Sequence, residues 1–246
     1  MERRYDVKIV GSGGSGGGLF KNVKINGEAQ FSGDVDCLAF RCNGTSKVYG
    51  SLKGTSCTVN GTLDITDDFD TGEAKINGKM EIEGNLKARS IRSFGETNVR
   101  GNVAGEEVGL QGTFHIKGHC EAEKLRIQGI FRIGGLVNAG EVDMAVNSRC
   151  EVKEIGGESI RIHRAEGNML KKLIGAFFLP SDYYEGTLAA GSIEGDHIYA
   201  EHTTADVIRG ATIVLGPGCR IGRVEYTERF ECHPSSAVQE QDQLQI

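Results

Sequence analysis

A fixed spacing of 17 residues between glycines constrains this chain more than any other feature of its sequence. The glycines of this series are Gly27, Gly44, Gly61, Gly78, Gly95, Gly112 and Gly129. A second series, in which Asp67 replaces one glycine, lies six residues behind the first. Glycine suits corners of the chain because it accepts positive φ without steric cost. The spacing therefore predicts a repeated structural unit of about 17 residues.

Columns of mostly apolar residues recur at the same period. The four columns start at Ile25, Phe31, Val35 and Phe40. Within a repeat the apolar positions come in pairs two residues apart, such as Met80 with Ile82 and Leu86 with Ala88. A period of two is typical of a β-strand with both side chains on one face. Each repeat is therefore expected to hold three short strands joined at three corners, which makes a triangular coil.

Stacked triangular coils form a β-helix, in which equivalent residues lie about 4.8 Å apart in ladders. The sequence thus predicts an all-β solenoid with about 17 residues per coil. The alternative is the left-handed hexapeptide helix of acyltransferases. That fold needs a regular six-residue period, and therefore about 18 residues per coil, whereas this chain keeps 17 with unequal sides. The pattern alone leaves the handedness open.

The repeat divides the chain into five segments. We expect an N-terminal segment with a Gly/Ser linker at 1–22, β-helix coils at 23–162, an insert at 163–192, further coils at 193–230 and a disordered polar tail at 231–246. The side chains expected to face the core in the C-terminal coils are Ile198, Val207, Ile213, Ile221 and Val224.

The insert, which fits none of the columns, is short and either helical or irregular. On a helix, its apolar residues lie on one face, opposite Lys171 and Lys172. One interpretation is an amphipathic segment that contacts a membrane surface or a partner. The other is a helix that covers the core or fills a gap between the two parts of the solenoid. The candidate contact residues are Met169, Leu170, Lys171, Lys172, Leu173, Ile174, Phe177 and Phe178.

No motif in the sequence points to catalysis, a cofactor or a metal. The chain has seven cysteines but no C-x-x-C pair, and Cys42, Cys57, Cys120 and Cys150 fall in apolar columns, where cysteine acts as a small hydrophobe. No stretch has the long apolar core of a signal peptide or a spanning helix. A reduced cytoplasmic setting is therefore expected. The net charge of −6 disfavours a nucleic-acid partner.

One outward column is basic. It contains Lys24, Arg41, Lys75, Arg92 and Arg126. Stacked cations suit an anionic lipid or nucleic acid. However, Glu73, Glu107, Glu141 and Glu158 stand nearby in the sequence pattern. The favoured interpretation is a face laced with salt bridges.

Two stretches resemble a known family. VKINGEAQFSGDVDCLAF, followed by VYGSLKG, resembles the opening of bactofilins, which are polymer-forming bacterial cytoskeletal proteins. IEGDHIYAEHTTADVIRGATIVLGPGCRIGRVEY resembles the C-terminal end of the longer bactofilin-like proteins of Gram-positive bacteria. The resemblance implies a right-handed β-helix, head-to-tail assembly into non-polar filaments without nucleotide, and a scaffold role at the membrane. Typical bactofilins are shorter, and here an insert at 165–190 splits the helix.

The ends of a β-helix expose a strand edge and an open apolar core, and such edges invite pairing with another chain. The candidate polymerisation ends are Val7, Ile9, Val10, Val224, Tyr226 and Phe230. The main hypothesis is a non-enzymatic, self-assembling bactofilin-like scaffold. Its expected partners are copies of itself, an anionic membrane surface, and envelope or motility proteins. The alternatives are a monomeric β-helix adaptor and a carbohydrate-active or acyl-transfer β-helix enzyme.

Overall fold

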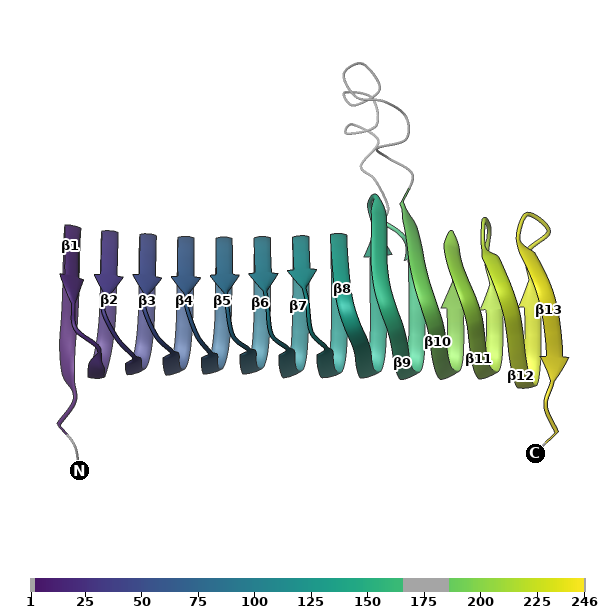
Figure 1. Cartoon of the computed structure of the whole chain (residues 1–246), viewed down its shortest axis with the longest axis horizontal. Helices are drawn as coiled ribbons and strands as arrows, with labels where there is room; N and C mark the ends of the chain where they lie inside the picture. The colour runs from purple at the N-terminus through teal and green to yellow at the C-terminus, as the bar shows by residue number, and fades with distance from the viewer. Residues whose placement is uncertain (1–2, 166–185, 246) are drawn as a thin grey trace, which may run out of the picture. The chain divides into compact units, whose positions relative to one another are not determined.

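The computed structural model describes residues 3–165 and 186–245, and these residues form β-strands and no helix. Figure 1 shows the strands as successive turns of the chain. The strands are β1 (Tyr5–Ser15), β2 (Gly18–Phe31), β3 (Val35–Val48), β4 (Leu52–Ile65), β5 (Phe69–Ile82), β6 (Leu86–Val99), β7 (Val103–Ile116), β8 (Cys120–Val146), β9 (Arg149–Arg164), β10 (Thr187–Ala200), β11 (Thr203–Leu215), β12 (Arg220–Cys232) and β13 (Ala237–Gln243).

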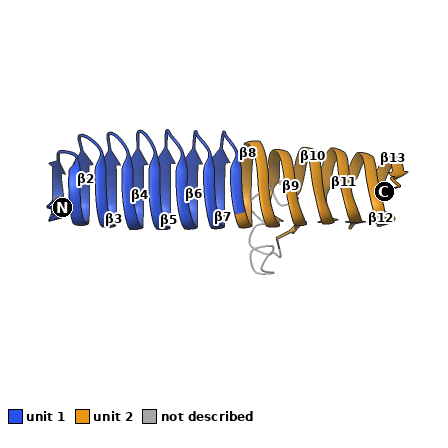
Figure 2. Cartoon of the chain, turned by 90° about the horizontal axis from the view of Figure 1, so that it is seen from below, with its two compact units in different colours: residues 1–122 blue, residues 123–246 orange. Residues whose placement is uncertain are grey.

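The chain forms two compact units, residues 1–122 and 123–246 (Figure 2). The first contains β1 to β7 and the start of β8, and the second contains the rest of β8 and β9 to β13. Within each unit the strands follow one another in chain order and pair in parallel. This arrangement confirms the predicted β-helix solenoid.

The register of the first unit repeats the 17-residue period. Val35 of β3 pairs with Leu52 of β4, and Leu52 pairs with Phe69 of β5. Each coil holds one continuous 14-residue strand, followed by a short break such as that between Val48 and Leu52. The expected three strands per coil are thus one strand that bends. Only the corner at the second glycine series interrupts it.

Three pairs of inward side chains per coil preserve the predicted sides. In β5, the buried positions are Phe69 with Thr71, Ala74 with Ile76, and Met80 with Ile82. The four columns read from the sequence are buried throughout both units wherever they continue. Burying an aliphatic side chain of this size contributes about 1.5–3 kcal/mol to the free energy of folding. Each coil is therefore stabilised mainly by the contacts of its inward side chains with one another and with those of the neighbouring coils.

Aromatic rings fill the core at the N-terminal end of the first unit. Phe31 lies 6.2 Å from both Phe20 and Phe40 between ring centroids, and the rings are inclined to one another. Tyr5 packs edge-on against Phe20 at 5.2 Å. Such inclined pairs add to the stability that area burial gives. The first coils are therefore packed closely up to the outermost strand.

Gly78 shows why the first glycine series is required. Its φ is +135°, which L side chains rarely adopt. A Cβ at this position would lie 2.1 Å from the carbonyl oxygen of Gly61 on the preceding coil. Here the strand bends without leaving the ladder, and only glycine allows the coils to approach this closely.

Side-chain ladders reinforce the corners of the first unit. The amide Nδ2 of Asn43 donates to Oδ1 of Asn26 at 3.0 Å, and Asn60 and Asn77 continue the ladder at 2.9 and 2.8 Å. At the break between strands, Asp68 Oδ1 accepts from the backbone N of Asn85 at 2.7 Å. These bonds run between equivalent positions, so they hold the coils in register.

The second unit keeps the fold but loses the strict period. Leu188 of β10 pairs with Thr203, and Thr204 of β11 pairs with Arg220, so these coils are shorter by one or two residues. Val207, which the sequence analysis places inward, is only half-buried, whereas Ile208 is fully buried. That expectation is wrong because a one-residue slip moves a side chain to the other face of a strand.

The C-terminal tail is ordered where disorder is expected. Residues Ala237–Gln243 form β13, which pairs in parallel with β12. The expectation of a disordered tail over 231–246 is therefore wrong for this stretch. The sequence of this stretch is polar and has no apolar pattern that would predict a strand. The strand is held instead by backbone hydrogen bonds to β12. The part of the expected insert at 166–185 lies outside the described residues.

Candidate functional site

The N-terminal strand β1 presents an edge that pairs on one side only. Val7 and Ile9 pair with Val23 and Ile25 of β2, yet both remain half-buried because no coil covers them among the described residues. Val10 is 67% exposed. The structure thus places Val7 and Ile9 at an open end of the core, whereas Val10 is in register with Asn26 on the outer face. Edges of this kind are templates for pairing with another chain.

The C-terminal end differs from the expectation. Val224 is fully buried because β13 covers it, with Gln241 as its partner in the register. Tyr226 and Phe230 are half-buried and contact each other, with ring centroids 5.5 Å apart. The outermost strand is therefore β13 rather than β12. It carries the exposed Glu240 and three exposed glutamines, and polar and charged side chains discourage edge pairing.

The candidate contact residues of the insert lie outside the described residues. These are Met169, Leu170, Lys171, Lys172, Leu173, Ile174, Phe177 and Phe178. Within the described ranges, no helix is long and apolar enough to cross a membrane.

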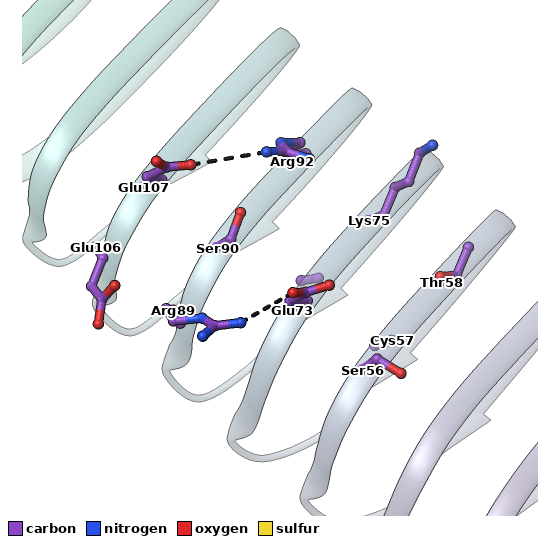
Figure 3. A pocket seen from close by; sticks show the side chains of 11 residues that line it. Ser56, Cys57, Thr58, Glu73, Lys75, Arg89, Ser90, Arg92, Glu106 and Glu107 are labelled. Atoms are coloured by element: carbon purple, nitrogen blue, oxygen red, sulfur yellow. Dashed lines mark hydrogen bonds and ion pairs between the residues drawn. The ribbon is translucent and has the colours of Figure 1, made fainter.

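A polar groove of about 440 Å³ runs across β4 to β7 of the first unit (Figure 3). Outward side chains on either side of an inward column form its walls, and the buried Cys57 and Ala74 lie beneath it. Arg89 contacts Glu73 at 3.1 Å, and Arg92 contacts Glu107 at 3.9 Å. The groove follows directly from the repeat, because the same columns supply both walls in every coil.

The cysteine that lines this groove is not in a state suited to nucleophilic chemistry. Burial raises the pKa of the Cys57 thiol well above its ordinary value of 9.0, and the nearby thiols of Cys37 and Cys42 raise it further. The thiol therefore stays protonated, whereas the reactive form of cysteine is the thiolate. Glu73 and Glu107 are exposed and face arginines. Among the described residues, no group of three or more His, Cys, Asp and Glu side chains could hold a metal ion.

The basic column is in register but is only partly paired. Lys24 and Arg41 are neighbours in the register of β2 and β3, and Lys75 and Arg92 are neighbours in the register of β5 and β6. Of these, Arg92 alone has an ion pair with a described carboxylate. The prediction of a salt-bridged face therefore holds for Arg92 and fails for the other three. Lys8 of β1 extends the column by one coil, as its register with Lys24 shows.

The local sequence explains why most cations of the basic column lack an ion pair. The neighbouring outward column has Asn22 and Ala39 beside Lys24 and Arg41, so these cations have no acidic neighbour there. Glu73 stands beside Lys75 in the sequence but contacts Arg89 instead. In the second unit, Glu141 contacts Lys124 at 3.4 Å, and Arg126 has no carboxylate partner among the described residues. The face is therefore more cationic than sequence spacing suggests.

Comparisons with known proteins identify two similar proteins from Bacillus subtilis (strain 168). YhbE, described as uncharacterized, is 55% identical over 237 residues, which cover 96% of this chain and 97% of YhbE. YhbF, also described as uncharacterized, is 37% identical over 111 residues. That match spans 45% of this chain and only 42% of YhbF. No protein-family model matches the chain, and no solved structure matches it.

Proposed function

This chain belongs to the family of Bacillus subtilis YhbE, and we propose that it is a non-enzymatic, bactofilin-like scaffold that assembles with copies of itself. The observation that carries the proposal is the unpaired β1 edge with a half-open core behind it. Its proposed setting is the cytoplasmic face of the membrane, where it supports cell shape, envelope or motility machinery.

The β1 edge combines two driving forces for association. Its backbone N–H and C=O groups on the outer side lack a strand partner among the described residues, and pairing satisfies such groups. Val7, Ile9 and Tyr5, which is 56% exposed, add apolar area beside them. Covering this area with a second copy removes it from water at about 25 cal/mol per Å². A second copy fits because identical ladders continue the same hydrogen-bonding pattern.

A finite adaptor is the second candidate, and β13 favours it. This strand has seven residues; Glu240 is exposed on it, and the half-buried Asp242 contacts Arg223 of β12 at 2.8 Å. Short, charged edge strands oppose further pairing. If only the β1 end associates, the product is a dimer rather than a filament. The two candidates therefore differ in the number of ends that take part.

Sedimentation velocity and negative-stain electron microscopy of the full chain test both candidates. We expect concentration-dependent association of the wild-type protein and its loss in Ile9→Lys, because the new ammonium lies at the open core end and resists burial. Gln241→Lys on β13 is the matched control at the opposite end. Filaments that Gln241→Lys weakens as well indicate that both ends assemble.

A limiting dimer, abolished by Ile9→Lys and unaffected by Gln241→Lys, favours the finite, dimeric adaptor. A wild-type protein that stays monomeric at all concentrations and salt levels refutes self-assembly and favours the monomeric adaptor. Circular dichroism of each variant checks that the solenoid is retained.

The unpaired basic column supports the proposed position near an anionic membrane. Each Lys or Arg close to such a surface adds about 1 kcal/mol of attraction. We expect vesicles that contain phosphatidylglycerol to bind the wild type and to lose affinity for the triple variant of Lys24, Arg41 and Lys75 to Gln. A double change of Lys53 and Lys87 to Gln is the control, because these exposed lysines lie in another column. Equal loss in both variants contradicts a role for this column.

A further inference from the structure

A pocket of about 530 Å³ lies in the second unit, along one side of β9 to β12. Its polar lining is strongly cationic and none of its lining residues is acidic. The lining side chains that matter here are Arg149, Arg164, Arg220, His202, Thr187 and Thr204. This concentration of cations is unexpected in a chain whose net charge is −6.

The strand register brings these residues together from distant parts of the sequence. Arg149 at the start of β9 pairs with Thr187 at the start of β10. Thr204 of β11 pairs with Arg220 at the start of β12. His202 stands between β10 and β11, where its carbonyl accepts a hydrogen bond from the backbone N of Leu188 at 3.1 Å. The strand starts of successive coils thus converge on one side of the unit.

The positive charge of the pocket is incompletely balanced. Arg164 donates from Nε to the carbonyl of Gly186 at 3.1 Å, and neither its guanidinium nor that of Arg220 pairs with a described carboxylate. Arg149 contacts Glu151 at 3.4 Å, but Glu151 also contacts Arg132 at 3.0 Å. One carboxylate is therefore shared between two arginines. Like charges gathered in this way favour an anion between them.

The backbone at the pocket departs from ordinary geometry. His202 has a φ of +46°, and it is the only non-glycine residue with positive φ in the described ranges. Gly218, with a φ of +75°, makes room for its ring, since a Cβ there would lie 2.3 Å from His202 Nδ1. Strained backbone positions persist only where the surrounding structure holds them, and they cluster at active and ligand-binding sites. His202 lines the pocket from such a position.

We propose that this pocket binds a phosphate group carried by a small phosphomonoester or by a lipid headgroup. Guanidinium groups present planar forks of donors that match phosphate oxygens, and Arg is preferred over Lys for that reason. The hydroxyls of Thr187 and Thr204 add neutral donors. The volume exceeds that of a bare phosphate, which leaves space for an attached organic group.

Isothermal titration calorimetry of the full chain with inorganic phosphate and with glycerol 3-phosphate tests the free ligand. Flotation with phosphatidylglycerol vesicles, against pure phosphatidylcholine vesicles, tests the lipid headgroup. Both use roughly physiological salt, which screens exposed charges beyond about 8 Å. Arg220→Gln is the main variant, because this exposed residue has no described ion pair to lose. Arg149→Gln is the second, since Glu151 keeps Arg132.

We expect binding with a dissociation constant in the millimolar range or tighter, and at least a tenfold loss of affinity in both variants. Lys87→Gln is the control, because this exposed lysine lies outside both the pocket and the basic column. Binding of the soluble compounds identifies a phosphomonoester, and binding of vesicles alone that both pocket variants weaken identifies a lipid headgroup. No binding in either arm, binding retained in both pocket variants, or an equal loss in Lys87→Gln overturns the proposal.

Discussion

Replacing Gly78 by alanine tests the physical basis of the repeat. With φ at +135°, a side chain at this position is strained by about 1–3 kcal/mol. The added Cβ also meets the Gly61 carbonyl oxygen at 2.1 Å. The coils must separate to relieve that contact, which weakens at least one ladder hydrogen bond worth about 1 kcal/mol. The expected local destabilisation is therefore about 2–4 kcal/mol.

Hydrogen exchange followed by mass spectrometry is the appropriate assay, because each coil of a solenoid contacts only its neighbours and opening can be local. Amides of β4, β5 and β6 should exchange about thirtyfold to several hundredfold faster in Gly78→Ala, since 1.4 kcal/mol corresponds to about a factor of ten. Strands of the second unit should be unaffected.

Gly109→Ala is the matched control. A Cβ at Gly109 lies 3.7 Å from its nearest neighbour, the carbonyl oxygen of Ile91, and φ is not in the left-handed region. This change should be neutral or stabilising by up to about 1 kcal/mol, through a less flexible unfolded chain. If the two variants differ by less than about 1 kcal/mol, close approach between coils is not what requires glycine in this series.

Three further predictions concern buried polar groups. Ser46→Ala should raise the thermal unfolding midpoint, because its buried hydroxyl has no partner among the described side chains, whereas Ser93→Ala should lower it by breaking the 2.7 Å bond to Thr97. At pH 8, iodoacetamide should label Cys232 alone in the native protein and all seven cysteines after denaturation, as peptide mass spectrometry can show. The contribution of the Cys120 thiol to stability should be constant below about pH 9 and fall above it, because burial raises its pKa to about 12, so the folded thiol keeps its proton while the unfolded one ionises. The slope of stability above about pH 9, up to about 1.4 kcal/mol per pH unit and thiol, should be shallower in Cys120→Ala.

The regular part of the fold could be predicted because each column averages over many coils. Ser93 is polar, but its column contains Ile76 and Leu110, so the position is still assigned correctly to the core. The same averaging hides single exceptions, such as the unpaired hydroxyl of Ser46 beside Ala29 and Leu63. Repetition therefore gives strong information about the position and weak information about the individual residue.

The features that sequence reasoning missed lie where the period changes. Arg149 and Arg164 are the first and last residues of β9, and Arg220 begins β12, so no single 17-residue column contains all three. Only the register of the folded strands places them around one pocket. Strand β13 was missed for a different reason: Val238 is its one aliphatic side chain larger than alanine, so its pairing rests on backbone groups that every sequence possesses. The N-terminal edge was accessible to sequence reasoning, because the apolar alternation of Val7 and Ile9 starts there.

The asparagine ladder has a consequence for how this chain can change in length. Asn26, Asn43, Asn60 and Asn77 bond only because the same number of residues separates each from the next. Inserting or deleting one residue between two of them would turn the following side chains to the opposite face. Inserting a whole coil would leave every ladder intact. In this part of the molecule, evolution is therefore expected to add or remove residues only in steps of one complete coil. The length of related chains should then differ by multiples of about 17 residues in this region.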